Sequence, residues 1–432
     1  MFRLPKNNLS SSGKMMAFMS VASLLSNAIS LVAGLFVARW LLPEQLGLFN
    51  GFGIITSYLI LVQIGVPSGL SRQLPFYMGK QEQAKALKTA AVSHYWAILT
   101  GVGSIIIASI IALVFLWLNE PQYAAGVFVI GISSFQGLYI TKYLKVLYRS
   151  NNDFNKLSTI DIVLSLATLA SLYFVYEYKF YGLCLRALFL FGVDWALTHY
   201  WRPIKAKPQW DSITFKELLQ VGMPIFWVAN IYGLWPVFQR SAIVYWGGAK
   251  ALGLFSLAII VDTGIKTLSN AISNVSFPKM AFAWGQGRPF IELLRIPLKP
   301  VAASLLINGV AAVAGWLLIP YFVQLLLPNY IDGTAAAQWQ LIAGWLGSLT
   351  VFSNIYMIIE KNMDRLWSFL SGIGIWFLAC ILLYQNLGFN LIIFPLATIA
   401  GLLAIYLVDV FNFYRYAHTI QNTNQPNNET RL

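Results

Sequence analysis

Seven ionisable residues lie inside long apolar stretches of this 432-residue chain: Asp161, Arg186, Asp194, Arg240, Asp262, Lys266 and Asp409. A charge placed within a membrane is costly and usually faces the protein interior or water. Arginine can bind a phosphate through two hydrogen bonds, and lysine offers it a point charge. The three cations of this set, together with Arg39 at the end of the first apolar stretch, are therefore candidate contacts for an anionic group.

The acidic residues allow a second kind of chemistry. Asp262 and Lys266 are four residues apart, which places them on one face of a helix. They either neutralise one another, or Lys266 binds an anion while Asp262 is its counter-ion. Asp161, Asp194 and Asp262 could titrate if they are desolvated, which would couple transport to H⁺ or Na⁺.

A more conservative interpretation exists for three of the cations. Arg186 and Arg240 lie within about two turns of the ends of their apolar stretches, and Arg39 lies at the rim of its own. Long basic side chains in such positions can extend to the lipid headgroups. Snorkelling therefore stays open beside a role in binding.

The composition indicates the setting of these charges. Apolar residues make up 58% of the chain and charged residues 10%, against about 45–50% and about 25% in soluble domains. With a mean hydropathy of +0.66, this excludes a soluble enzyme, a disordered chain and a fibrous repeat. The apolar runs lack the alternation of membrane β-strands, and a helical span needs about 20 residues. We predict an all-α polytopic membrane protein with twelve spans, at residues 15–40, 46–70, 89–118, 123–147, 158–176, 180–200, 217–246, 251–277, 297–326, 336–359, 365–386 and 388–413.

Most of the net charge of +13 reflects the orientation of the chain in the membrane. Of the 29 lysines and arginines, 23 fall on one predicted side of the membrane, in residues 1–14, 72–88, 142–156, 202–216, 279–299, 361–365 and 415–431. Cations accumulate in cytoplasmic loops, so both termini are predicted to be cytoplasmic. Contact with anionic headgroups accounts for these cations, and we expect membrane lipid and no nucleic acid as a partner.

An internal repeat divides the chain. Residues 37–55 resemble residues 243–261 at an offset of 206, with Leu46-Gly47-Leu48-Phe49 matching Leu252-Gly253-Leu254-Phe255. The two copies are six spans apart and have the same orientation, which predicts a pseudo-two-fold axis along the membrane normal. We expect two six-helix lobes, at residues 1–206 and 207–432.

Glycine and proline mark candidate flexible points. Gly65 and Pro67 lie in the second predicted span, and Pro224 and Pro236 in the seventh. Kinks at these residues could open and close a central cavity. The alternative is close helix packing through small residues, which Gly47-x-x-x-Gly51 also suits.

Other chemistry lacks a sequence signal. The histidines His94, His199 and His418 are scattered, and neither a zinc motif nor a phosphate-binding GxxxxGK[ST] loop nor a GxSxG elbow is present. The two cysteines, Cys184 and Cys380, lie in apolar runs and read as buried free thiols. We expect no cofactor, no metal site and no enzymatic activity.

Four short motifs resemble a known family. Residues 38–47 (ARWLLPEQLG) end the first span like the A-R-x-L-x-P-x-x-x-G signature of polysaccharide-biosynthesis flippases. Residues 65–72 (GVPSGLSR), 218–224 (LLQVGMP) and 278–279 (PK) are similar to further motifs of that family in the same order. The group includes the Wzx-type O-antigen flippases of the multidrug/oligosaccharidyl-lipid/polysaccharide exporter superfamily. Where the family often has an Asp-Arg pair in the seventh span, this chain has Gln239-Arg240.

The resemblance implies a MATE-like fold of two six-helix bundles around a cavity. It implies alternating-access transfer of undecaprenyl-diphosphate-linked oligosaccharide, an O-antigen or other surface-polysaccharide unit, to the outer leaflet of the bacterial cytoplasmic (inner) membrane. A polysaccharide polymerase and a chain-length regulator are the implied protein partners. Two alternatives stay open: a MATE-type cation-coupled multidrug antiporter, and a membrane polysaccharide polymerase, which would need a large loop on the far side.

Overall fold

The structure is a computed structural model that describes residues 9–423, with only the backbone described at 9–21, 23–24, 60, 228–229, 232, 274, 278 and 419–423. Nearly all of the described chain is helical, which confirms the predicted all-α membrane fold. A helix satisfies its own backbone hydrogen bonds, as a segment surrounded by lipid must. The predicted topology cations Arg3, Lys6 and Arg431 lie outside the described residues.

By its internal contacts the chain forms two compact units, Met1–Gly253 and Leu254–Leu432. The predicted pseudo-symmetric boundary after residue 206 is a different kind of division and stays a prediction. Among the described residues, nine helices are long and apolar enough to cross a membrane. The longest of these, Gly233–Gly285, has 53 residues and covers parts of two predicted spans. The total of twelve spans also stays a prediction.

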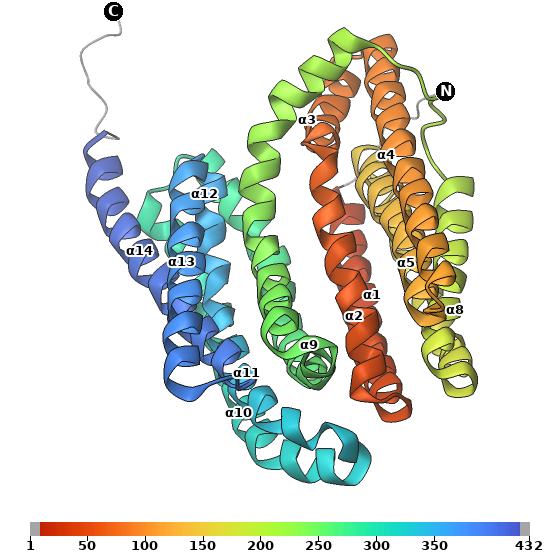
Figure 1. Ribbon diagram of the computed structural model, residues 1–432. Coiled ribbons are helices and arrows are strands. Elements are labelled where there is room, and N and C mark those ends of the chain that lie inside the picture. Colours follow the sequence, from red (N-terminus) through yellow and green to blue (C-terminus); the bar gives the residue numbers. More distant parts are fainter. Residues whose placement is uncertain (1–8, 424–432) are drawn as a thin grey trace, which may run out of the picture. The chain divides into compact units, whose positions relative to one another are not determined.

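The first unit holds the helices drawn from red to green in Figure 1. They are α1 (Leu9–Trp40), α2 (Pro43–Leu59), η1 (Ile60–Gln63), α3 (Val66–Gly79), α4 (Gln83–Trp117), α5 (Pro121–Phe135), η2 (Gln136–Leu144), α6 (Lys145–Ser150), α7 (Phe154–Ala170), α8 (Leu172–Tyr200) and the first part of α9 (Ser212–Gly285).

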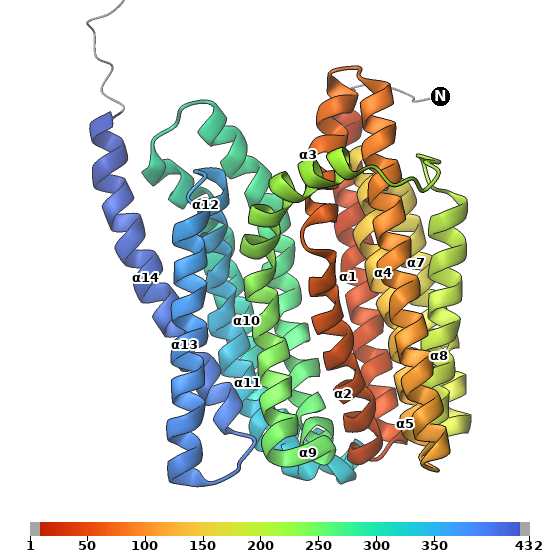
Figure 2. The same cartoon turned by 45° about the horizontal axis from the view of Figure 1, so that its top comes forward.

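The second unit holds the rest of α9 and the helices drawn in blue-green to blue (Figure 2). They are α10 (Phe290–Leu326), η3 (Pro328–Gly333), α11 (Thr334–Gly347), η4 (Ser348–Asn354), α12 (Ile355–Ile358), α13 (Asn362–Leu387) and α14 (Ile393–Thr423). The antiparallel helices α13 and α14 lie side by side, joined by a short turn.

The helices α8 and α9 each contain one residue with non-helical backbone angles, which divides the helix into two segments. Lys179 has a left-handed φ of 50° inside α8, at the turn predicted between residues 176 and 180. Gly248 has a φ of 72° inside α9, between the predicted spans 217–246 and 251–277. A positive φ is easily adopted by glycine because it has no Cβ.

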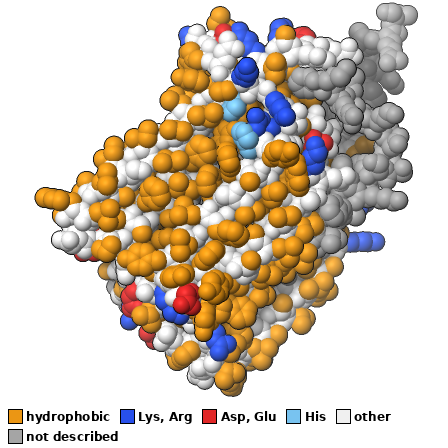
Figure 3. Space-filling view, turned by 90° about the vertical axis from the view of Figure 1, so that its right-hand side faces the viewer, with side chains coloured by type: hydrophobic (Ala, Val, Ile, Leu, Met, Phe, Trp, Pro, Cys, Tyr) orange, Lys and Arg blue, Asp and Glu red, His pale blue; other side chains and the backbone are white. Residues whose placement is uncertain are grey.

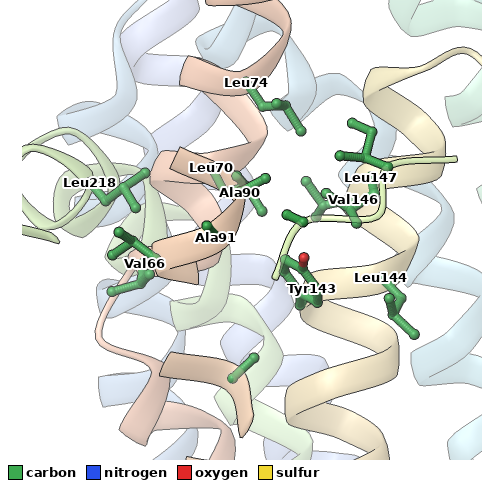
Figure 4. Close-up of a cluster of buried hydrophobic side chains, with 14 of the residues drawn as sticks. Val66, Leu70, Leu74, Ala90, Ala91, Tyr143, Leu144, Val146, Leu147 and Leu218 are labelled. Atoms are coloured by element: carbon green, nitrogen blue, oxygen red, sulfur yellow. The ribbon is translucent and has the colours of Figure 1, made fainter. Parts of the chain in front are cut away.

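A buried core of the first unit joins α3, α4, η2, α6 and α9. Figure 4 shows Val66, Leu70 and Leu74 facing Tyr143, Leu144 and Leu147 across this cluster. All six side chains are at most 1% exposed.

On the outer face seen in Figure 3, apolar side chains cover the middle and the charged ones gather towards the ends, as expected for a surface embedded in lipid.

The predicted linker at residues 201–215 is held against the bundle. Asp211 Oδ1 accepts a hydrogen bond from the backbone N–H of Thr214 at 2.8 Å, which caps the start of α9, and its Oδ2 lies 2.9 Å from Lys88 Nζ. These contacts, the backbone hydrogen bond first, lower the pKa of Asp211 to about 2.

The two copies of the sequence repeat contact one another within the first unit. A Cβ on Gly47 would overlap the carbonyl oxygen of Ala249, and one on Gly253 would overlap that of Pro43. Glu44 and Lys250 lie 3.5 Å apart. Each contact joins residues at repeat-related positions, an exchange that a local two-fold axis would produce.

We expect Gly47→Ala to destabilise the protein by about 1–3 kcal/mol, because the added methyl group must displace backbone atoms. Gly51→Ala is the matched control, since nothing lies within 4 Å of a Cβ there. Thermal unfolding of the purified protein in detergent measures both. Equal melting temperatures for the two variants would contradict the close contact between the repeat copies.

Candidate functional site

Asp194 is the centre of a buried polar cluster in the first unit. It is 3% exposed, and its Oδ2 accepts a hydrogen bond from Gln136 Nε2 at 2.9 Å. Gln136 is the first residue of η2, a nine-residue π-helical segment, a type of helix that often occurs at functional sites. Asp194 Oδ1 is buried and has no hydrogen-bond partner. A buried carboxylate oxygen in this state is able to accept a proton or a cation.

Asp161 lies at the edge of this cluster, with its side chain 44% exposed. Lys145 Nζ lies 3.5 Å from Asp161 Oδ1 and also interacts electrostatically with Asp194. The Asp161 carbonyl accepts a hydrogen bond from Ser165 Oγ at 2.7 Å, and Ser26 Oγ of α1 lies 2.7 Å from the same hydroxyl oxygen. Two of the three carboxylates singled out from the sequence are thus brought together around one lysine.

Two of the candidate cations of the first unit lie apart from this cluster. Arg39 is exposed in the last turn of α1, which fits an interfacial position. Arg186 is half-buried, and its Nε donates to Ser171 Oγ at 3.2 Å, at the junction of α7 and α8. Arg186 therefore contacts a neighbouring helix.

Arg240 lies in the part of α9 that belongs to the first unit. Arg240 is half-buried, the adjoining Gln239 is 9% exposed, and both have interaction partners. Arg240 is thus partly withdrawn from solvent and lipid, as a cation of an interior cavity would be.

In the second unit, Lys266 and Asp262 form the ion pair that their spacing allows. Lys266 Nζ lies 2.7 Å from Asp262 Oδ2, and Asp262 Oδ1 accepts a hydrogen bond from Gln340 Nε2 of α11 at 3.0 Å. The side chain of Lys266 stays 34% exposed. The geometry shows a paired lysine that still has access to its surroundings, so neutralisation and anion binding are both compatible with it.

A second buried carboxylate, Asp409, received no role from the sequence. It is 4% exposed on α14 and accepts hydrogen bonds from Ser353 Oγ at 2.6 Å, Ser368 Oγ at 2.6 Å and Tyr356 OH at 2.9 Å. These donors come from η4, α12 and α13, so the carboxylate links three neighbouring elements. The only sequence signal was an aspartate within an apolar stretch, because the hydroxyl partners are distant in the chain.

The structure also corrects the description of the histidines as scattered. Tyr139 OH lies 3.2 Å from His94 Nε2 and 3.1 Å from His199 Nδ1, and His94 Nδ1 contacts the Ala206 carbonyl at 2.8 Å. Tyr139 thus brings His94 and His199 close together, although they are 105 positions apart in the sequence. Among the described residues no group of three metal-ligating side chains occurs.

The predicted flexible points differ in their backbone. Ile64 and Gly65 both have positive φ, 42° and 90°, and interrupt the second span between η1 and α3. A Cβ on Gly65 would lie 2.7 Å from the Gly222 carbonyl carbon, so this glycine also allows close helix packing. Pro67 is buried in the first turn of α3.

Pro224 and Pro236 lie within α9. Both are exposed, and the helix has its non-helical residue at Gly248 rather than at either proline. A gating role for these prolines, and for Gly65 and Pro67, stays a prediction.

Comparison with known proteins identifies the family. Residues 36–303 match the family model described as "Polysaccharide biosynthesis protein". The match covers more than half of the chain, so the protein belongs to this family, as its sequence motifs predicted. A search of curated protein sequences found no match.

The solved structures similar to this chain include MATE transporters, two of which are described as members of the MOP superfamily. An inward-facing multidrug resistance MATE family transporter has a TM-score of 0.74 at 15% identity, covering 92% of this chain and 96% of that one. An outward-facing one has a TM-score of 0.63 at 16% identity, with coverages of 94% and 96%. A variant of the Vibrio cholerae MATE transporter VcmN has 0.61 at 16% identity, with coverages of 96% and 98%. At this identity the similarity establishes the fold, which is MATE-like.

We expect Asp409→Asn to lower the free energy of unfolding by about 1.5–3 kcal/mol, because the amide loses charge-assisted hydrogen bonds and places an N–H₂ group among hydroxyl donors. The measurement is thermal unfolding in detergent, with the exposed Asp332→Asn as control. Ser368→Ala should have a smaller effect in the same direction. Unchanged stability in both Asp409→Asn and Ser368→Ala would show that the hydroxyl groups do not hold an ionised carboxylate.

Proposed function

We propose that this protein is a flippase that moves an undecaprenyl-diphosphate-linked oligosaccharide from the cytoplasmic to the outer leaflet of the bacterial inner membrane by alternating access. The cargo is an O-antigen or other surface-polysaccharide repeat unit. Both termini are cytoplasmic in this proposal, and the lobes that alternate are residues 1–206 and 207–432. A polymerase and a chain-length regulator would use the product. The observation that carries the proposal is the family match over residues 36–303 on a MATE-like fold.

The cations of α9 support an anionic cargo. A lipid diphosphate carries at least two negative charges, and moving it through a low-dielectric region without partners would be prohibitive. Lys266 and Arg240 are both half-buried in membrane-spanning helix. Asp262 neutralises Lys266 in the absence of cargo, and a diphosphate could replace this carboxylate as the partner of the ammonium group. No bond in the cargo is made or broken in this process.

Ion coupling is assigned in the proposal to the cluster around Asp194. The free Oδ1 atom of Asp194 and the nearby Asp161 and Lys145 provide a carboxylate whose charge can be altered by H⁺ or Na⁺. Because Gln136 and Asp194 join η2 to α8, a change of charge at Asp194 would alter the packing of two helices.

The second candidate function is a cation-coupled multidrug antiporter. The observation that favours it is the set of multidrug MATE transporters among the similar structures. Neighbouring genes distinguish the two, since glycosyltransferases and a polymerase accompany a glycan flippase.

We expect Lys266→Ala and Arg240→Ala each to reduce surface glycan by about tenfold or more, since each removes a charge-assisted contact with the diphosphate. Surface glycan is measured in cells that depend on the variant, and membrane insertion is checked by the amount of protein in the membrane fraction. The exposed Lys216→Ala is the control. Normal surface glycan in both α9 variants would contradict the cavity-cation proposal, and loss of drug resistance with normal glycan would favour the antiporter.

Asp194→Asn is expected to abolish the response of transport to an imposed ion gradient, because the amide can neither take up a proton nor neutralise Na⁺. The test measures transfer of lipid-linked oligosaccharide in proteoliposomes under separate pH and Na⁺ gradients. Glu177→Gln, an exposed position on the same helix, is the matched control. An unchanged gradient response in Asp194→Asn would remove Asp194 from ion coupling.

A further inference from the structure

An apolar groove lies between α10 and α11 in the second unit. Its volume is about 450 Å³, and it is lined by Gly309, Ala312, Val313, Trp316, Leu317 and Trp345, among others. Gly309 lies against Trp345 of α11, where an added Cβ would be 3.3 Å from the indole nitrogen.

The side chains that line this groove are apolar. Trp345 Nε1 already donates to the Leu305 carbonyl at 2.8 Å, so its polar edge is occupied within the protein. Behind the groove, Ala312 packs with Ile265 and Leu341 in a buried apolar cluster. A ligand in the groove is therefore recognised by shape and apolar contact.

The groove opens on the exposed side of α10. Of the nine candidate spans among the described residues, α10 has the lowest buried share, 17% of its apolar window. Leu306 is 73% exposed, Val310 72%, Val313 65% and Leu317 63%. Side chains with this exposure in a membrane helix contact acyl chains, so the occupant at this depth is a lipid chain.

Two basic residues lie on the same face of α10, closer to the start of the helix. With 3.6 residues per turn, Arg295 and Lys299 fall within a stripe of about 60° that also holds the four exposed apolar residues. Arg295 and Lys299 are exposed, and within the described part of the chain neither forms an ion pair. Glu292 lies on this face as well, but Arg288 Nη1 is 3.8 Å from its Oε2.

The spacing between the cations and the near end of the groove spans one leaflet. Lys299 precedes the groove residues of α10, 309–317, by ten to eighteen residues, or about 15–27 Å of helix. Half of the hydrocarbon core of a bilayer is about 15 Å. A lipid phosphate at Lys299 would thus place the end of its acyl chain at the Gly309 end of the groove.

We propose that the α10–α11 groove is a binding site for one acyl chain of an anionic glycerophospholipid, whose phosphate contacts Arg295 and Lys299. The cations lie on the outer surface of α10, where a resident lipid stays, whereas a transported headgroup has to pass through the protein. Such a lipid would brace α10 against α11, the helix whose Gln340 binds Asp262. The proposal does not depend on the identity of the cargo.

The experiment uses purified full-length protein in detergent micelles and a phosphatidylglycerol probe with a photoreactive diazirine at the end of one acyl chain. Labelled peptides are identified by mass spectrometry, and the matching phosphatidylcholine probe tests for charge. We expect labelling of residues 309–317 and 342–345 that is at least fivefold stronger with phosphatidylglycerol. The double variant Arg295→Gln/Lys299→Gln should reduce it at least fivefold, and Val313→Trp, which fills the groove from its open side, should do the same.

Matched controls separate these effects from general lipid contact. Ile107→Trp adds an indole at a similarly exposed position of α4, and Lys205→Gln/Lys207→Gln removes two exposed cations elsewhere. Neither control should change the labelling, and thermal unfolding verifies that every variant is folded.

Three results would overturn the proposal. Equal labelling by the two probes would remove the anionic headgroup, and undiminished labelling in Val313→Trp would remove the groove. Displacement of the probe by an equimolar amount of undecaprenyl diphosphate would assign the groove to the carrier lipid. All three are read without a transport assay, so they are independent of failure of the flippase proposal.

Discussion

The pairing of charges inside apolar helices is the constraint on which the rest of this structure depends. Each carboxylate within a span has to be compensated locally, because the lipid around the helices offers no hydrogen bonds. Asp262 is compensated by Lys266 and Gln340, Asp409 by three hydroxyl groups, and Asp161 by Lys145. These contacts connect helices that the apolar surfaces alone would not hold in one register. Asp194 is the exception, because one of its oxygens is left without a partner.

A transporter can use buried charges whose partners are incomplete or can be replaced by a cargo or an ion. Three hydroxyl donors surround Asp409, and such a site holds its charge in place. The pair of Lys266 and Asp262 is different, since the lysine is partly exposed and an incoming anion can compete for it. The two units thus contain both fixed and exchangeable charges, and the exchangeable ones are those assigned to cargo and coupling ion.

The repeat has a physical consequence in the contact of its two copies. Gly47 and Gly253 lack side chains at positions where the backbone of the other copy comes close, and Glu44 faces Lys250. Such an arrangement requires glycine at both repeat-related positions. This explains why the identity between the copies is concentrated in the short segments around Gly47 and Gly253.

The sequence by itself determined the membrane class, the helical fold and the i, i+4 pair of Asp262 and Lys266, because these follow from composition, period and local spacing. The family was indicated by the resemblance of four short motifs to those of known flippases. It also indicated the turn at Lys179, where a charged segment interrupts two apolar runs. Only the tertiary structure decided that Gln136 meets Asp194, that Tyr139 lies between His94 and His199, and that three hydroxyl groups surround Asp409. Each of these contacts joins residues on different helices, and their separation of 41 to 60 positions leaves no periodic signal in the chain. The groove between α10 and α11 was hidden for the same reason, since a cavity depends on how two helices pack and not on the period of either one.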